Sequence, residues 1–201
     1  MKSPQFFYSL GSSFLYDALI ARFFTPFRQE SFESLDVQAN ETVLIAGAGT
    51  GLDFPHVPKE GNFIAFDLNE GMLKQAQKRK RENISLVRTD CHTLPFQDAT
   101  FDKVSCFLIV SIIPSPELFF AELHRVLKPG GRIVVFDKFY EGQNNPLLNA
   151  INLIASRVAS NINFNFSDFS ERELAQSFKI TADEGKALSG YFRFIQLERL
   201  P

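Results

Sequence analysis

The sequence predicts an α/β protein with a mostly parallel seven-stranded sheet between helices, and three observations lead to that prediction. From Glu41 onward, short β-branched apolar runs alternate with amphipathic helical stretches. The run from Val104 to Ile113 is apolar nearly throughout, which is typical of a strand buried on both faces of a parallel sheet. The last two strand candidates, joined by a loop around Ser189 and Gly190, predict an antiparallel C-terminal hairpin strand. Together these patterns indicate a Rossmann-like three-layer sandwich.

The elements follow one another without a linker long enough to separate two domains. The N-terminal stretch from Phe6 to Phe24 predicts one or two apolar helices, and Pro26 is expected to break the helical pattern. Strands are predicted over 42–48, 62–68, 84–90, 102–113, 131–139, 178–188 and 190–200, and helices over 69–83, 116–127, 146–160 and 170–177.

Size and charge limit the possible functions. With 201 residues, of which 45% are hydrophobic, the chain is expected to fold as a single domain, residues 1–201. A net charge of −2 gives no general attraction to nucleic acid, and none is expected as a partner. Cys91 and Cys106 form no CxxC pair, so neither a disulfide framework nor a metal site is predicted, and a reducing cytoplasm fits. The apolar N-terminus resembles neither a signal peptide nor a membrane span, because charged residues interrupt it.

A glycine-rich turn follows the first predicted strand in "VLIAGAGTGLDFP", with Gly47, Gly49 and Gly51 at alternate positions. In a doubly wound sheet this is where backbone N–H groups face a ligand. A dinucleotide fingerprint requires a third small residue at position 52, where Leu52 stands, so NAD is disfavoured. No Gly-Lys-Ser/Thr ending follows, so a phosphate loop is disfavoured too. The turn is predicted to hold a bulky ligand that is not strongly anionic, with a plain tight turn as the alternative.

Two aspartates end the next two predicted strands. Asp67 closes "FIAFD", where a carboxylate can accept from both hydroxyls of a ribose. Asp90 closes "LVRTD", where it can accept from an adenine amine while the Cys91 N–H faces a ring nitrogen. Taken singly, Asp67 could instead cap a helix and Asp90 could be a turn residue. Three successive strand ends of this kind favour an adenosyl ligand.

At this point the chain resembles the class I S-adenosylmethionine-dependent methyltransferases, through "VLIAGAGTG", "IAFDLNEGML", "RTDCHTLPFQDATFDKV" and "ELHRVLKPGGRIVVFD". The resemblance implies S-adenosyl-L-methionine as donor and S-adenosyl-L-homocysteine as product. It divides the chain into an N-terminal helical lid (1–35), a donor-binding core (36–140), and C-terminal helices with a closing hairpin (141–201). The donor-binding residues it implies are Gly47, Ala48, Gly49, Gly51, Asp67, Leu68, Asp90, Cys91, Phe107 and Leu108. The family often has an acidic residue where this chain has Ile45, so the group that holds the methionine amine is not predicted.

Within the family, the sequence is most similar to those of bacterial phosphatidylethanolamine N-methyltransferases and quinone C-methyltransferases. The expected acceptor is therefore small or amphipathic, such as an amine or a phospholipid headgroup, with Tyr8, Tyr16 and His56 as candidate acceptor residues. The alternatives are a quinone-type C- or O-methyltransferase and an adenosyl-binding module without transfer activity. Few basic residues accompany the N-terminal aromatics, so at most transient membrane contact is expected. No catalytic residue and no oligomeric state are predicted.

Overall fold

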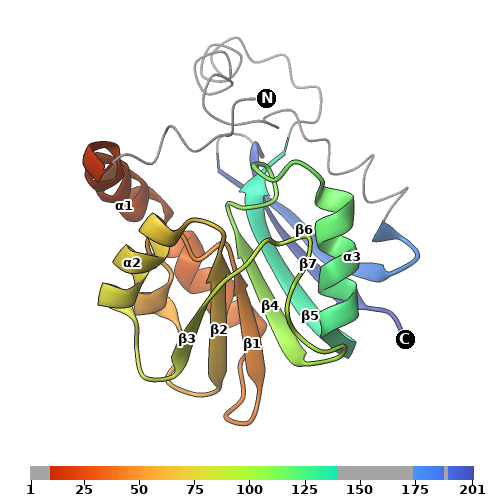
Figure 1. The fold of residues 1–201 in the computed structure, drawn as a ribbon. Coiled ribbons are helices and arrows are strands. Elements are labelled where there is room, and N and C mark those ends of the chain that lie inside the picture. Colours follow the sequence, from red (N-terminus) through yellow and green to blue (C-terminus); the bar gives the residue numbers. More distant parts are fainter. Residues whose placement is uncertain (1–9, 140–173, 188–189) are drawn as a thin grey trace.

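The computed structural model describes residues 10–139, 174–187 and 190–201, and its side chains from residue 22 onward. These residues form one seven-stranded sheet in the order β3-β2-β1-β4-β5-β7-β6 (Figure 1). The strands are β1 (Thr42–Ala46), β2 (Asn62–Asp67), β3 (Ile84–Arg88), β4 (Phe101–Phe107), β5 (Leu127–Lys138), β6 (Phe178–Ala187) and β7 (Phe192–Arg199). The helices are α1 (Leu10–Leu35), the short 3-10 helix η2 (Phe54–His56), α2 (Glu70–Arg79) and α3 (Pro116–Val126). The first five strands pair in parallel, whereas β7 is antiparallel to both β5 and β6. The predicted fold class is confirmed.

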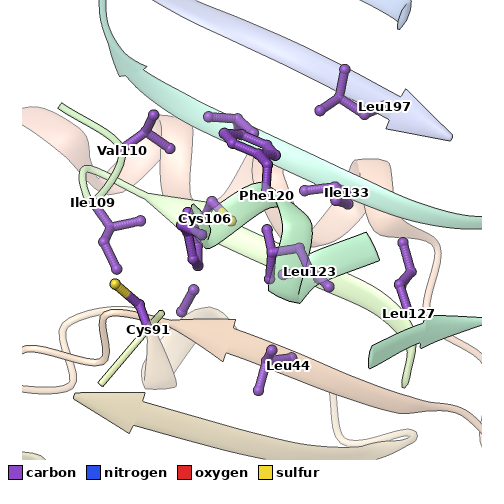
Figure 2. Close-up of a cluster of buried hydrophobic side chains, with 14 of the residues drawn as sticks. Leu44, Cys91, Cys106, Ile109, Val110, Phe120, Leu123, Leu127, Ile133 and Leu197 are labelled. Atoms are coloured by element: carbon purple, nitrogen blue, oxygen red, sulfur yellow. The ribbon is translucent and has the colours of Figure 1, made fainter. Parts of the chain in front are cut away.

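Both faces of the sheet are covered, which explains the continuous apolar strands. Successive side chains of a strand point to opposite faces. Val43 and Ile45 of β1 therefore join a cluster with residues of α1 and α2, while Leu44 and Ala46 join a second cluster with α3. Figure 1 shows α3 on the opposite side of the sheet from α1 and α2. Figure 2 shows Leu44, Phe120 and Leu123 in the α3 cluster.

Local sequence signals set the ends of α2 and α3. The Asn69 side chain accepts hydrogen bonds from the N–H groups of Gly71 and Met72, and so caps α2. Pro116 occupies the first turn of α3, where its missing N–H has no cost. The apolar stripe of α3 packs on the sheet through Phe119, Phe120, Leu123 and Val126.

The first helix differs from its prediction, because α1 runs through Pro26 as far as Leu35. The expected break at Pro26 is wrong. Proline removes one hydrogen bond from a helix interior, but the turns that follow carry apolar residues at helical spacing. Phe24, Phe32 and Leu35 are buried against the sheet, and this packing outweighs the local cost of the proline. No helix within the described residues is long and apolar enough to cross a membrane.

The fourth strand is shorter than predicted. β4 ends at Phe107, and Leu108 has a φ of +57°, so the chain leaves the sheet there instead of continuing to Ile113. The N–H of Ile112 donates to the carbonyl of Ile109 in the following turn. Ile109, Val110 and Ile113 are nevertheless buried in the α3 cluster. An apolar run in a buried turn has the same sequence pattern as a buried strand, which explains the error.

The pairing of β6 with β7 confirms the predicted closing hairpin. β6 lies at the edge of the sheet, and most of its side chains are exposed. The helix predicted over 146–160 lies outside the described residues. Of the one predicted over 170–177, the structure describes only the end, where residues 175–177 form a turn.

Candidate donor-binding site at the carboxyl edge of the sheet

The sheet brings the predicted site residues to one edge. The carboxyl ends of β1, β2, β3 and β4 lie at the same edge because these strands are parallel. β1 has β2 on one side and β4 on the other, so the strand order reverses at this position. In open α/β sheets, ligands bind at such a reversal, outside the carboxyl ends of the strands. The glycine turn follows β1 directly and therefore occupies the position where a ligand is expected.

The glycine turn is shaped partly by packing and partly by open space. Gly49 and Gly51 have φ values of +52° and +80°, a region that strongly favours glycine. A Cβ on Gly51 would lie 2.9 Å from the Phe54 ring, so packing requires this glycine. Among the described residues, a Cβ on Gly49 would meet nothing closer than the Gly47 carbonyl oxygen at 3.9 Å. Gly49 therefore faces space that the protein leaves open.

Asp67 holds this turn in place. Its Oδ2 accepts from the N–H of Gly49 at 2.8 Å, and its Oδ1 accepts from the N–H of Asn69 at 2.8 Å. Burial raises the pKa of the Asp67 carboxyl, although the hydrogen bonds from Asn69 and Gly49 oppose the shift. A carboxylate oxygen can accept more than one hydrogen bond, so each oxygen retains capacity for a ligand hydroxyl. The cap of α2 is Asn69, so Asp67 is not the helix cap that sequence reasoning left open.

Asp90 follows β3 and engages its neighbour His92. The Asp90 Oδ1 accepts from the His92 N–H at 2.9 Å and lies 2.8 Å from His92 Nδ1. The hydrogen bond from the His92 N–H is the main reason that the Asp90 pKa lies below its ordinary value. The Asp90 side chain is 47% exposed, and its lowered pKa keeps the carboxylate ionised at neutral pH. An ionised carboxylate only accepts hydrogen bonds, which suits contact with an exocyclic amine.

The side chain of Cys91 belongs to the α3 cluster, and Figure 2 shows its sulfur pointing toward Ile109. Burial raises the pKa of its thiol to about 12. Ligand atoms of Asp90, Cys91 and His92 lie within 4.8 Å of one another.

Four other residues that are predicted to bind the methyl donor, Ala48, Leu68, Phe107 and Leu108, differ in their exposure and backbone conformation. Ala48 is buried, and its N–H donates to the Phe66 carbonyl at 2.7 Å. Leu68 is 60% exposed, as expected of an apolar side chain free to cover a ligand ring. Phe107 is buried at the end of β4, and the guanidinium of Arg28 lies 4.6 Å from its ring centroid. Leu108, next to it, adopts a left-handed backbone conformation.

The connection from β1 to β2 also bears on the ligand. The only helix in this connection is the 3-10 helix η2, of three residues. A long helix starting at the glycine turn would direct its positive N-terminus at the ligand, as phosphate sites require. No such helix follows the glycine turn, and the class of ligand that the turn holds stays a prediction.

Of the three candidate acceptor residues, the structure describes the side chain of His56 alone. Tyr8 and the side chain of Tyr16 lie outside the described residues. His56 lies in η2 and lines a shallow groove of about 350 Å³ with residues of α1, among them Gln29 and Phe32. Burial and the nearby Arg28 lower the pKa of His56. A role in acceptor binding stays a prediction for all three.

Sequence reasoning missed the buried ion pair of Arg28 and Asp53. The Arg28 Nε donates to the Asp53 Oδ1 at 2.8 Å, and the two side chains are only 6% and 8% exposed. Arg28 lies in α1 and Asp53 directly after the glycine turn. Nothing in the sequence pairs residues so far apart, and Arg28 lies beyond the helix break that the sequence predicts at Pro26.

Comparison with known proteins finds a family that matches this part of the chain. A family model described as "Methyltransferase domain" matches residues 44–135. This range contains the glycine turn, both strand-end aspartates and the end of β4.

Two curated relatives illustrate the similarity. A phosphatidylethanolamine N-methyltransferase of Cereibacter sphaeroides is 28% identical over 164 residues, which cover 78% of this chain and 79% of the relative. A demethylmenaquinone methyltransferase of Renibacterium salmoninarum is 35% identical over 129 residues, which cover 60% of this chain. The match spans 54% of that second protein's length.

Solved structures share the fold. The crystal structure of an S-adenosylmethionine-dependent methyltransferase from Mesorhizobium loti superposes with a TM-score of 0.66 at 16% identity. The superposition covers 85% of this chain and 96% of that one.

Proposed function

The chain belongs to the class I S-adenosylmethionine-dependent methyltransferases, and on that premise we propose that it methylates the amine of an amphipathic, phospholipid-like acceptor. The observation that carries the donor assignment is the Asp67 carboxylate, which bridges the N–H groups of Gly49 and Asn69 at the carboxyl edge. The likeness to a phosphatidylethanolamine N-methyltransferase, which extends over most of both chains, supports the acceptor.

The residues present fit this donor. Open space at Gly49 accommodates a ligand against the backbone. Asp67 retains acceptor capacity for two ribose hydroxyls, Asp90 offers an ionised carboxylate for the adenine amine, and exposed Leu68 can cover the adenine ring. When bound, S-adenosylmethionine supplies an electrophilic methyl group.

An amine acceptor agrees with the side chains at this edge. Transfer to carbon or oxygen usually requires a general base, whereas a neutral amine needs only to be bound without its proton. Burial and the nearby Arg28 lower the pKa of His56, so its imidazole is a weak base, and the proposal assigns it no proton transfer. The main task of the protein is to hold donor and acceptor in line and to exclude water.

A second candidate is methylation of a quinone carbon, which the similarity to a demethylmenaquinone methyltransferase supports. The two acceptors differ chemically, because a quinone precursor must lose a proton from a ring carbon or hydroxyl. A chain that only binds the adenosyl ligand is the third possibility, and Ile45 in place of the usual acidic residue motivates it.

One assay separates the three. The purified chain is incubated with methyl-labelled S-adenosylmethionine and either vesicles containing phosphatidylethanolamine or micelles containing demethylmenaquinone, and the products are identified by mass spectrometry. We expect methylated phosphatidylethanolamine only, and no product from the Gly49→Val variant. Product from the quinone alone contradicts the proposed acceptor. Binding of S-adenosylhomocysteine without either product supports the binding module.

A further inference from the structure

The buried ion pair of Arg28 and Asp53 is incomplete on the arginine side. Arg28 is 5% exposed, and its Nε donates to Asp53. Its Nη1 is buried, and none of the residues that the structure describes accepts a hydrogen bond from it. A buried, charged donor without a partner is costly, and native proteins rarely keep one without a reason. The Arg28 guanidinium is more than nine-tenths buried, and its Nη1 has no acceptor among the described residues. This suggests that a ligand accepts a hydrogen bond from Nη1.

The pair lies beside the donor site. Asp53 comes two residues after Gly51 of the glycine turn. The Arg28 guanidinium lies 4.6 Å from the ring centroid of Phe107, the last residue of β4. Phe107 and Ile45 belong to the same buried cluster as the α1 residues around Arg28. The pair thus joins α1 to the region between the glycine turn and the end of β4.

The charges of the pair match one part of the donor. Besides its adenosine, S-adenosylhomocysteine carries an amino acid end with one carboxylate and one ammonium. Asp67 and Asp90 are both acidic and fit the adenosine, but neither fits a carboxylate. Ile45, which is 1% exposed, offers no charge where the family often has an acid. Arg28 and Asp53 supply both of the charges that the zwitterionic end requires.

We propose that Arg28 and Asp53 form the subsite for the amino acid end of the donor, with the guanidinium holding its carboxylate and the Asp53 carboxylate holding its ammonium. The inference rests on the proposed function for the identity of the ligand. Asp53 has acceptor capacity for this role, because Arg28 is the one side chain of the described residues that donates to it. In this proposal Asp53 takes the role of the acidic residue that the family often has at the position of Ile45.

A purely structural pair would only anchor α1 to the glycine turn, and two ligands distinguish these roles. S-adenosylhomocysteine has the amino acid end, whereas 5′-methylthioadenosine has the same adenosine and sulfur without it. Calorimetric titration of both ligands is compared between the wild type, Arg28→Met and Asp53→Asn. Arg22→Met is the matched control, since Arg22 is an exposed arginine of the same helix.

We expect Arg28→Met to weaken S-adenosylhomocysteine binding by about 10-fold to 100-fold, the usual value of a charge-assisted hydrogen bond. The affinity of Arg28→Met for 5′-methylthioadenosine should stay within about two-fold of the wild type. Arg22→Met should change the affinity for neither ligand. Arg28→Lys keeps the positive charge and should retain part of the affinity for S-adenosylhomocysteine. If Arg28→Met does not fold, Arg28→Lys serves as the test in its place.

Equal weakening of both ligands by Arg28→Met or Asp53→Asn would overturn the subsite and leave a structural anchor. Unchanged affinity for S-adenosylhomocysteine would overturn it as well. If the folded wild type binds 5′-methylthioadenosine and S-adenosylhomocysteine equally well, the amino acid end has no subsite, yet the donor site stands. If it binds neither ligand, the proposed function itself fails.

Discussion

At the scale of single residues, the glycines of the turn have different roles, one in packing and one in ligand binding. Gly51 is required by packing against Phe54, whereas Gly49 faces open space and donates its N–H to Asp67. Folding and ligand binding therefore depend on different glycines that are two residues apart. Substitution of each glycine should separate the two effects.

We expect Gly49→Val to abolish binding of S-adenosylhomocysteine and to cost only about 1–2 kcal/mol of stability from its positive φ. Gly51→Ala should instead lower the free energy of unfolding by more, because its Cβ would also lie 2.9 Å from the Phe54 ring. Urea unfolding and calorimetry measure the two quantities. Normal ligand binding by a folded Gly49→Val variant would remove the glycine turn from the site.

The Asp67 carboxyl predicts a pH dependence of binding. Burial raises its pKa above the ordinary value of 3.8, and the ribose contact requires the ionised form. As the pH falls, Asp67 is therefore protonated earlier than an ordinary aspartate, and the affinity for S-adenosylhomocysteine should begin to fall at a correspondingly higher pH.

Asp67→Asn is the control for this experiment. It should bind about 10-fold more weakly at neutral pH, because it loses a charge-assisted contact. Its affinity should fall with pH only through the titration of the ligand, which both proteins share. Identical pH profiles for the two proteins would show that Asp67 does not bind the ligand as a carboxylate.

At the scale of elements, α1 combines a predicted lid with a part of the core. Phe24, Phe32 and Leu35 are buried against the sheet, and the Phe32 ring meets that of Phe63 edge to face at 6.2 Å between centroids. The lid function proposed for residues 1–35 stays a prediction. It concerns the part of α1 before Phe24, since a lid must open and a buried segment resists opening.

Phe32→Ala tests whether the second half of α1 belongs to the core. Phe32 is 3% exposed, so the substitution should lower the free energy of unfolding by about 3–5 kcal/mol. Gln29→Ala, at an exposed position one turn earlier, should change it by less than about 0.5 kcal/mol. Equal, small effects of both substitutions would mean that α1 is only loosely attached to the sheet.

The elements also show how far sequence reasoning extends. The strand and helix order was predictable because alternation and caps such as Asn69 are local signals. The helix through Pro26 and the end of β4 at Phe107 were not, because tertiary packing decides both. The positions of Asp67 and Asp90 at the carboxyl edge were predictable from the strand pattern, and their contact with the donor stays a prediction. Arg28 and Asp53 were not, because their pairing exists only once α1 is folded against the glycine turn.

At the scale of the whole molecule, the order of the sheet assembles the site. The reversal at β1 and β4 places the glycine turn between Asp67 on one neighbouring strand and Phe107 on the other. α1 then crosses this region and contributes Arg28. The adenosine and the amino acid end of the donor would thus be recognised by different elements, which meet only in the folded chain.

A crystal structure of the chain grown with S-adenosylhomocysteine tests this account most directly. We predict the ribose hydroxyls within hydrogen-bond distance of the Asp67 carboxylate, the adenine beside Leu68 and Asp90, and the ligand chain passing Gly49. A ligand bound elsewhere, or one whose ribose contacts residues other than Asp67 at this edge, would contradict it.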